Sequence, residues 1–473
     1  MSGPGAVSWQ PVDGSFRDPS GFVFTRDGTL YRQVNAGFRP TFEAFLSSGL
    51  YDELAGDGLL IPHTDAGLSQ AATADAFTVL RPERVPFISY PYEWSFGQLR
   101  DAALLTLDLQ QRALARDFVL RDASAYNVQF RDGRPIFIDT LSFEPRVEGT
   151  PWIAYGQFCE HFLVPLALMS LRDVRCSTLL RTHLDGVPLD LGSRLLPTTS
   201  WARLGLLLHV HLHAKAQSRY AGASVSAKGR GRTMSRNAVS GLVASLRSAV
   251  EGLAWNPAGT VWAEYATDNS YTTSAARSKR EIVTEYLRPL SPATVWDLGA
   301  NTGDYTRAAR EVAPQVVSFD LDPAAVERNY RRVREKSETG VLPLVLDLAN
   351  PSPAQGWAHS ERLSLEQRGP ADAVLALALV HHLAIGRNLP LPRIADFLAR
   401  LGRSLVIEFV PKEDSQVQRL LQNRPDIFPD YTREGFERAF ATRFRVDTVR
   451  PVEESGRQLY LMTACAPDGR PPT

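Results

Sequence analysis

The strongest constraint on the fold is the stretch at residues 295–304, which reads Val-Trp-Asp-Leu-Gly-Ala-Asn-Thr-Gly-Asp. It predicts a short apolar strand, an abrupt glycine turn and the start of a helix. A second apolar run, residues 316–319, is followed directly by Asp320. In a doubly wound α/β domain this arrangement puts a carboxylate beside a backbone loop that can approach a ligand closely. The stretch therefore predicts an α/β domain that holds a nucleotide-type cofactor at the carboxyl ends of its strands.

The residues of the turn narrow the kind of cofactor. No G-x-x-x-x-G-K-[ST] pattern follows the strand, so a phosphate cradle with its lysine is not expected. Asp297 precedes Gly299, and Asn301 and Gly303 follow at two-residue steps. Asn tolerates the left-handed backbone that Gly adopts freely, so Asn301 can occupy a tight turn. The pattern resembles the D-x-G-x-G-x-G motif of class I S-adenosylmethionine (SAM)-dependent methyltransferases, with Asn301 at the middle glycine.

Short apolar runs alternate with helical patterns beyond residue 295, which predicts a parallel sheet with right-handed crossovers. The expected strands and closing hairpin cover residues 295–298, 316–319, 342–346, 373–379, 404–409, 444–449 and 458–463. The expected helices cover residues 304–312, 323–334 and 394–401, the second of them capped by Asp322. The methyltransferase resemblance implies a Rossmann-like sheet of seven strands that ends in an antiparallel hairpin, over residues 255–464.

The same resemblance implies SAM as the cofactor and gives each position near the turn a role. Gly299 and Gly303 let the backbone approach the methionyl end of SAM, and Asp297 holds its ammonium group through water or backbone. Asp320 offers two acceptor oxygens to the ribose hydroxyls.

Three further positions are implied to contact SAM. Asp347 follows the third expected strand, where the family accepts the adenine amino group, and Leu348 would supply a backbone N–H. A cap or turn role is the alternative for Asp347. Tyr271 lies in an upstream segment that would fold over the cofactor, although ordinary core packing explains an aromatic residue there nearly as well.

The methyl acceptor is expected beside the loop after the fourth strand, which carries His381 and His382. The Asn/Asp-Pro-Pro-Tyr/Phe signature is missing, which argues against nucleobase and amide nitrogens as acceptors. Either histidine could take a proton from a hydroxyl as the methyl group transfers. Glu408 is a second candidate base or a structural acceptor, and positioning alone could suffice. We therefore expect O-methylation of a small molecule or natural-product intermediate.

Composition limits the other classes of function. With 473 residues the chain is too long for one ordinary core, so two domains are expected. Lys plus Arg and Asp plus Glu number 52 each, which argues against nucleic acid or a membrane as a partner. The three cysteines are widely spaced and form no metal pattern or disulfide framework. With no signal segment and no bilayer-spanning apolar run, a cytoplasmic protein without a metal site is expected.

A segment rich in Ser, Gly and Arg, residues 217–237, lacks periodic apolar positions and predicts a flexible linker. Its basic residues could meet a phosphate or acidic partner, or simply be solvated. The linker divides the chain into an amino-terminal domain, residues 1–216, and a methyltransferase domain, residues 238–473.

The amino-terminal half carries a second pattern. Asp122 precedes Asn127 by five residues, and Asp139 follows after an expected hairpin. The spacing resembles the catalytic loop and the metal-binding Asp of protein kinases and aminoglycoside phosphotransferases. The resemblance implies an α+β kinase-like domain, with a long helix at residues 96–114 and a small-lobe hairpin at residues 22–32.

The pattern also departs from that of active kinases. Leu120 replaces the His of the H-x-D motif, and no glycine-rich phosphate loop is present. Arg32 stands near the place of the phosphate-pairing lysine, with Glu43 or Glu53 as its expected partner. Arginine does not substitute freely for a compact ammonium group.

We therefore expect a degenerate module that binds a small-molecule or carrier-bound substrate, or that scaffolds the methyltransferase. The alternative is ATP with magnesium at Asp122, Asn127 and Asp139, which would make the chain a bifunctional kinase and methyltransferase.

Overall fold

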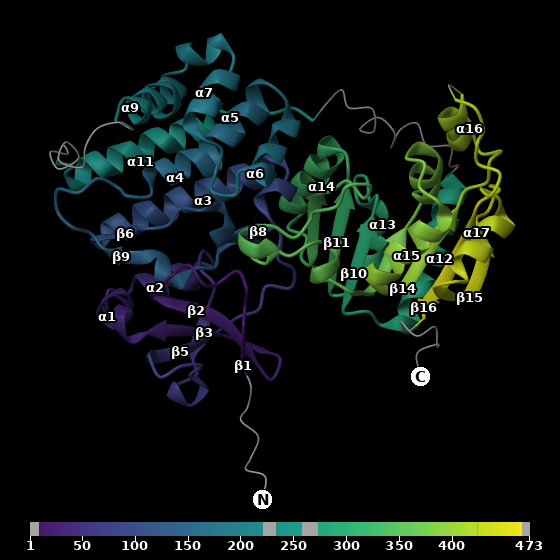
Figure 1. Ribbon diagram of the computed structural model, residues 1–473, viewed down its shortest axis with the longest axis horizontal. Helices are drawn as coiled ribbons and strands as arrows, with labels where there is room; N and C mark the ends of the chain where they lie inside the picture. Colours follow the sequence, from purple (N-terminus) through teal and green to yellow (C-terminus); the bar gives the residue numbers. More distant parts are fainter. Residues whose placement is uncertain (1–8, 221–232, 258–272, 423, 466–473) are drawn as a thin grey trace, which may run out of the picture. The chain divides into compact units, whose positions relative to one another are not determined.

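The computed structural model describes residues 9–220, 233–257, 273–422 and 424–465 (Figure 1). The chain divides into two compact units. The amino-terminal unit comprises Met1–Asn256 and Gly356–Arg362, and the carboxyl-terminal unit comprises Pro257–Gln355 and Leu363–Thr473. The chain therefore passes between the units at three points, after residues 256, 355 and 362.

A seven-stranded sheet forms the centre of the carboxyl-terminal unit, in the order β12-β11-β10-β13-β14-β16-β15. Its strands are β10 (Thr294–Leu298), β11 (Gln315–Asp320), β12 (Val341–Val345), β13 (Ala371–Ala376), β14 (Gly402–Phe409), β15 (Phe444–Pro451) and β16 (Gln458–Ala464). The first five are parallel, and β16 runs antiparallel to both of its neighbours. The expected Rossmann-like sheet with its terminal hairpin is confirmed.

Helices cover this sheet (Figure 1). They are α12 (Thr273–Leu287), α13 (Asp304–Arg310), α14 (Pro323–Lys336), α15 (Leu391–Leu401), α16 (Ser415–Leu421) and α17 (Arg433–Phe440). Asp322 caps α14 as predicted, because its carboxylate accepts the backbone N–H of Ala324 at 2.8 Å. The buried face of α15 carries Leu391, Ile394, Ala395, Leu398 and Leu401, the helical spacing that produces an apolar stripe.

The amino-terminal unit begins with a five-stranded antiparallel sheet, in the order β1-β2-β3-β5-β4. The strands are β1 (Trp9–Pro11), β2 (Gly21–Arg26), β3 (Thr29–Asn35), β4 (His63–Asp65) and β5 (Ala76–Pro82), with helices α1 (Arg39–Ser47) and α2 (Leu50–Gly56) between β3 and β4. Two short antiparallel pairs follow the long helix α3 (Phe96–Ala115), namely β6 (Phe118–Leu120) with β9 (Phe143–Pro145), and β7 (Val128–Arg131) with β8 (Arg134–Phe137). This is the α+β architecture that the kinase-like resemblance implied.

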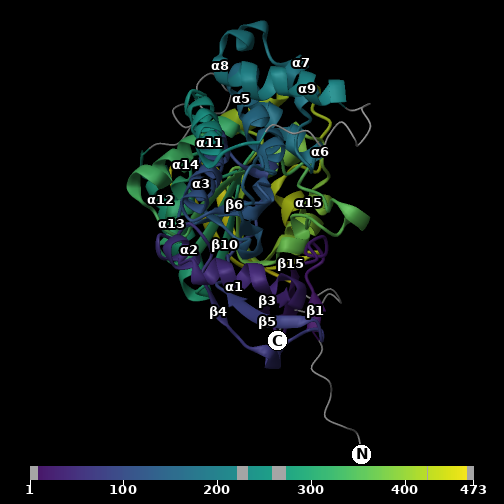
Figure 2. The ribbon, with the colours of Figure 1, turned by 90° about the vertical axis from the view of Figure 1, so that its left-hand side faces the viewer.

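The rest of the amino-terminal unit is helical, and Figure 2 shows α7, α8 and α9 gathered at one end of it. The helices are α4 (Tyr155–Phe158), η6 (Cys159–Leu163), α5 (Val164–Leu171), α6 (Leu179–Thr182), α7 (Leu189–Leu195), α8 (Leu204–Leu206), η9 (Leu207–Leu212), α9 (His213–Tyr220) and α11 (Arg236–Glu251). Two of them, η6 and η9, are π-helices. Among the described residues, no helix combines the length and the apolar character needed to cross a bilayer.

The division into units differs from the boundary that the sequence predicted at residues 217–237. Helix α11 lies beyond that segment but belongs to the amino-terminal unit, where it packs against α3. The Nε2 of Gln111 on α3 donates to the hydroxyl of Ser240 on α11 at 3.0 Å. The apolar face of α11 is therefore part of the amino-terminal core rather than the start of the methyltransferase domain.

Residues 356–362 also belong to the amino-terminal unit, although the chain on either side of them does not. The carboxylate of Glu361 accepts from the guanidinium of Arg17, with Nη2 at 2.6 Å from Oε1. The guanidinium of Arg362 lies 4.0 Å from the ring centroid of Tyr126, which is cation–π geometry. This short segment is thus held by charged side chains at two places.

Candidate cofactor and acceptor site

The glycine turn follows β10 and has the backbone that its sequence predicted. Gly299, Asn301 and Gly303 have φ angles of 77°, 49° and 85°, all in the left-handed region. The N–H groups of Gly299 and Ala300 both donate to the carbonyl of Phe319, at 2.8 and 3.0 Å. These bonds fix the turn to the carboxyl end of β11, next to Asp320.

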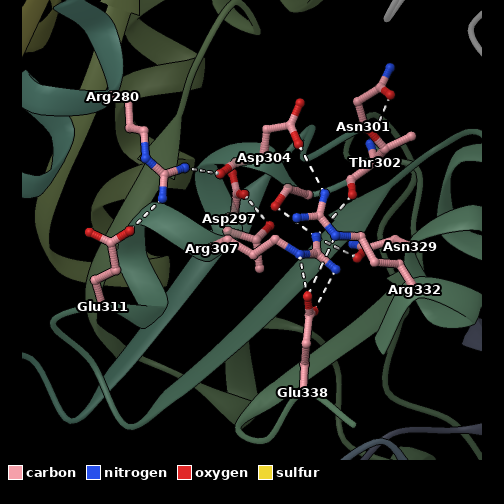
Figure 3. Close-up of polar contacts among 12 residues, drawn as sticks. Arg280, Asp297, Asn301, Thr302, Asp304, Arg307, Glu311, Asn329, Arg332 and Glu338 are labelled. Atoms are coloured by element: carbon pink, nitrogen blue, oxygen red, sulfur yellow. Dashed lines mark hydrogen bonds and ion pairs between the residues drawn. The ribbon is translucent and has the colours of Figure 1, made fainter. Parts of the chain in front are cut away.

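Arg307, which the sequence patterns did not indicate, holds the glycine turn through hydrogen bonds (Figure 3). Nη1 of Arg307 donates to the carbonyls of Thr302 and Gly303, at 3.0 and 2.8 Å, and to Oδ1 of Asn329 at 2.9 Å. Its other two nitrogens bind both carboxylate oxygens of Glu338, at 3.0 and 2.7 Å. Because this bidentate pair holds the guanidinium in one plane, the turn is braced against α14 and the residues after it.

We expect Gly303→Ala to weaken the binding of S-adenosylhomocysteine by about tenfold or more, since left-handed backbone costs about 1–2 kcal/mol for an ordinary residue. A Cβ on Gly303 would also lie 2.6 Å from Nδ2 of Asn329 and collide with the guanidinium of Arg307. Isothermal titration calorimetry measures the affinity. Gly28→Ala is the matched control, because φ is 74° there and no described atom lies within 4 Å of the new Cβ. Equal affinity of the Gly303→Ala variant and the native chain would contradict this role of the turn.

Two carboxylates flank the turn, of which Asp297 is buried and Asp320 is half-buried. Asp297, on β10, is 2% exposed, and its Oδ2 accepts the hydroxyl of Thr306 at 2.6 Å. Asp320, at the end of β11, accepts the N–H groups of Asn301 and Asp322 at 2.7 and 2.8 Å. Burial raises the pKa of each carboxyl to about 6. Each carboxylate oxygen can accept a further hydrogen bond, so the site fits a ligand that brings an ammonium group and ribose hydroxyls.

Asp347 and Leu348 are the residues expected to contact the adenine of SAM. One oxygen of Asp347 accepts the N–H of Ala349 at 2.9 Å, which is the turn role, and its other oxygen lies 3.4 Å from Arg387. Leu348 is half-buried directly after it. Adenine contacts for this pair stay a prediction. Tyr271 lies outside the described residues.

The two histidines lie in the loop after β13, where η13 (His382–Gly386) forms one turn of π-helix. His381 is completely buried, and neither of its ring nitrogens has a hydrogen-bond partner among the described residues. Its ring centroid lies 4.1 Å from that of His382. Burial lowers the pKa of both imidazoles, that of His382 to about 4, with a smaller effect from Arg457. Both rings are therefore neutral near pH 7.

Glu408, at the end of β14, is fully engaged as an acceptor. Its Oε2 accepts Nζ of Lys279 and the backbone N–H of Ala378, each at 2.7 Å. Nη1 of Arg457 lies 3.6 Å from Oε1. Lys279 on α12 is only 1% exposed, and its ammonium also lies 4.4 Å from the centroid of the Tyr305 ring. This ion pair ties α12 to the loop that carries the histidines.

In the kinase-like loop of the amino-terminal unit, Asp122 and Asp139 both have polar partners. Asp139 forms an ion pair with Arg32 and accepts the hydroxyl of Ser142. Asp122 accepts Nε2 of Gln157 at 2.8 Å, and burial raises its pKa. The expected pairing of Arg32 with Glu43 or Glu53 was wrong.

Those two glutamates have other cations as partners. Glu43 pairs with Arg39, and Glu53 pairs with Arg112 and Arg116. Asp139 instead neutralises Arg32, so a guanidinium occupies the position beside the carboxylate where a kinase would place its metal ion.

Among the described residues, no group of three or more His, Cys, Asp and Glu side chains is arranged to hold a metal ion. The π-helix η9 contains two histidines whose ring nitrogens are engaged in hydrogen bonds. The ring nitrogens of His209 are bonded to Tyr155 and Ser245, at 2.9 and 2.8 Å. Those of His211 are bonded to Ser193 and Ser200, both at 2.8 Å. These histidines are buried hydrogen-bonding groups of the amino-terminal core.

The chain is similar to several known proteins. No family model matches the chain. Nodulation protein NoeA of Rhizobium meliloti (strain 1021) is 40% identical over 455 residues, which are 95% of each protein. Among solved structures, WbdD is 18% identical and covers 42% of this chain and 42% of its own, with a TM-score of 0.30. Magnesium protoporphyrin IX methyltransferase from Synechocystis PCC 6803 is 15% identical and covers 43% and 92%, also with a TM-score of 0.30.

The sheet order, the left-handed glycine turn and the acidic ends of β10 and β11 together make the carboxyl-terminal unit a class I SAM-dependent methyltransferase. The relationship to the Rhizobium meliloti protein extends through both units, because it spans nearly the whole of each chain. This chain therefore belongs to the family of the nodulation protein NoeA.

Proposed function

We propose that this methyltransferase acts on an oxygen atom of a small molecule or a natural-product intermediate. One observation carries the proposal: the glycine turn and the histidine loop are in contact. A Cβ on Gly299 would lie 3.4 Å from Cδ1 of Leu379, two residues before His381. The loop that would hold the methyl donor thus meets the loop with two neutral imidazoles.

Each residue of the site has a distinct task in this reaction. When bound, SAM supplies a methyl group on a positively charged sulfur. Asp297 would hold the ammonium group of SAM and Asp320 its ribose hydroxyls, which would orient the methyl group toward the acceptor. The bound SAM would supply the methyl group to the acceptor oxygen and leave as S-adenosylhomocysteine, and a ring nitrogen of His382 would take the proton that this oxygen loses. We assign the proton to His382 because it is half-buried, whereas His381 is completely enclosed.

His382→Asn should lower kcat by about 10²–10⁴-fold, the usual contribution of a general base, and leave S-adenosylhomocysteine affinity unchanged. Product formation is followed by mass spectrometry as the gain of one methyl group. His381→Asn is the companion variant, and a larger loss of kcat there would move the base to His381. If kcat changes less than threefold in both variants, positioning rather than proton transfer drives the reaction.

The name of the Rhizobium meliloti relative gives the acceptor a context. We propose that the methylated product contributes to nodulation, and that the acceptor reaches the enzyme free or bound to a carrier. Incubating the purified chain with labelled SAM and extracts of nodulating and non-nodulating rhizobia tests this. Label that enters the same compounds from both extracts would contradict a nodulation-specific acceptor.

The amino-terminal unit is proposed to be a binding module rather than a kinase. The supporting observation is the ion pair between Arg32 and Asp139, which competes with magnesium for the same carboxylate. Titrating the full chain with ATP, with and without magnesium, separates the two functions. Magnesium-dependent binding that is lost in Asp139→Asn would establish the bifunctional kinase and methyltransferase instead.

A further inference from the structure

A row of leucines lies exposed along the helices that end the amino-terminal unit. Leu204, Leu208 and Leu212 are 69%, 42% and 43% exposed. They are spaced four residues apart through α8 and the π-helix η9, so they lie on one face of a continuous helical segment. Large apolar side chains on a surface are usually scattered singly, and a row of three is a mark of an interaction site.

Two neighbouring side chains widen this row. Leu195, at the end of α7, is 40% exposed, and Trp201 is 38% exposed. The Trp201 ring stacks on His211 of η9, with centroids 4.2 Å apart, and Nζ of Lys215 lies 4.7 Å from the Trp201 ring. We call Leu195, Trp201, Leu204, Leu208 and Leu212 the leucine face. It carries an aromatic ring that has a cation directly over it. Helix α7 contacts both η9 and α9, and Figure 2 shows α7, α8 and α9 at the same end of the unit.

The sequence around the leucine face is strongly basic. Residues 191–250 contain no Asp or Glu, in a chain that has 52 of them. Nine cations occur in the same stretch, namely Arg194, Arg203, Lys215, Arg219, Lys228, Arg230, Arg232, Arg236 and Arg247. Among the cations whose side chains the structure describes, Arg194, Arg236 and Arg247 form ion pairs with carboxylates, while Arg203 and Lys215 are exposed.

The acidic side chains close to this region are themselves engaged. Asp190 pairs with Arg194, at 2.9 Å, and Glu160 is half-buried, with a hydrogen bond to Gln217. The cations Arg203 and Lys215 are both exposed and flank the leucine face.

We propose that the leucine face is a peripheral binding site for the surface of an anionic lipid bilayer. Leucine and tryptophan side chains can enter the boundary between headgroups and acyl chains, while flanking cations meet the lipid phosphates. A second copy of the chain fits less well, because a symmetric contact would bring two basic regions together. Nucleic acid would satisfy the cations but leave the leucines against phosphates. The inference is independent of which acceptor is methylated.

Sedimentation of the full chain with extruded vesicles tests the proposal. We expect binding to vesicles that contain phosphatidylglycerol and weak binding to phosphatidylcholine alone. The triple variant Leu204→Gln, Leu208→Gln, Leu212→Gln should bind anionic vesicles about tenfold or more weakly, since each leucine loses its burial in the lipid. The matched control changes three other exposed apolar residues, Leu68, Ile153 and Ile427, to Gln, and it should bind as the native chain does.

A variant without two of the exposed cations tests whether their charge contributes to vesicle binding. Arg203→Ala with Lys215→Ala should weaken binding to anionic vesicles by about fivefold or more for each cation and leave binding to phosphatidylcholine unchanged. Equal loss in the triple variant and its control would overturn the proposal, as would no binding by the native chain. A native dimer that the triple variant converts to a monomer in light scattering would overturn it in favour of self-association.

Discussion

Asp320→Asn should weaken the binding of S-adenosylhomocysteine by two orders of magnitude or more. A hydrogen bond to a charged group contributes about 1.5–3 kcal/mol, and the Asp320 carboxylate is proposed to accept two ribose hydroxyls. The Asp320 side chain is half-buried, so water replaces its lost hydrogen bonds only in part. Titration calorimetry on the purified chain measures the effect. Circular dichroism and thermal unfolding show whether the variant is folded.

Asp322→Asn provides the matched control, because it makes the same change two residues away. Asp322 is 3% exposed and caps α14, and Asn serves as well as Asp at a helix N-terminus. We expect this variant to bind S-adenosylhomocysteine as the native chain does. Comparable losses in the two variants would show that the local backbone, rather than the Asp320 carboxylate, determines affinity.

The raised pKa of Asp320 adds a dependence on pH to the same prediction. Ribose hydroxyls donate to the ionised carboxylate, so affinity should fall as the pH is lowered through about 6. The ligand-free chain should show the opposite trend at this group. A carboxyl whose pKa is higher in the folded state contributes stability below its unfolded pKa and loses that contribution as the pH rises through 6. Asp320→Asn should remove both components.

Lys279→Met should lower the free energy of unfolding by about 3–5 kcal/mol, the cost of leaving one member of a buried ion pair without its partner. The Lys279 and Glu408 side chains are 2% and 0% exposed, and their charges lie 2.7 Å apart. Methionine keeps most of the length of the lysine side chain, so the effect reports the missing charge. Urea denaturation, followed by tryptophan fluorescence and circular dichroism, measures it.

An exposed pair of the same length supplies the control. Lys412 lies 2.7 Å from Asp426, with side chains 24% and 45% exposed, and Lys412→Met should cost less than about 1 kcal/mol. Adding Glu408→Gln to Lys279→Met should recover part of the lost stability, because it removes the buried carboxylate that keeps only the more distant Arg457 as its cation. Equal costs at the two lysines would refute the idea that the Lys279 pair is a buried structural element.

The sheet of the carboxyl-terminal unit could be predicted because its strands are short apolar runs with acidic residues at their ends. Val295–Leu298 and Val316–Phe319 each fall within one residue of the observed strand, apart from the acidic end of β11. Left-handed backbone at Asn301 was also predictable, since few residues other than glycine tolerate it. Such signals are local, and they specify the turn and both carboxylates of the cofactor site.

Features that depend on distant partners were not predictable. Lys279 has the spacing of a surface residue, and only the fold brings Glu408, 129 residues later, against it. Arg32 likewise meets Asp139 rather than a glutamate of the nearby helices, because β3 lies closer to that loop. The basic region around the leucine face was hidden by a whole-chain average of charge. Sequence patterns indicated which groups exist here, and tertiary contacts decided what each one pairs with.

The chain crosses between its two units three times, and this limits how recombination can exchange them. Proteins whose domains follow one another can exchange them by recombination at a single junction. Here a recombination break after residue 256 would leave residues 356–362 attached to the methyltransferase. Glu361 would then lose its partner Arg17, and Arg362 would lose its partner Tyr126. The two units are thus interleaved along the chain, and the similarity to the Rhizobium meliloti relative covers both of them, over 95% of each protein.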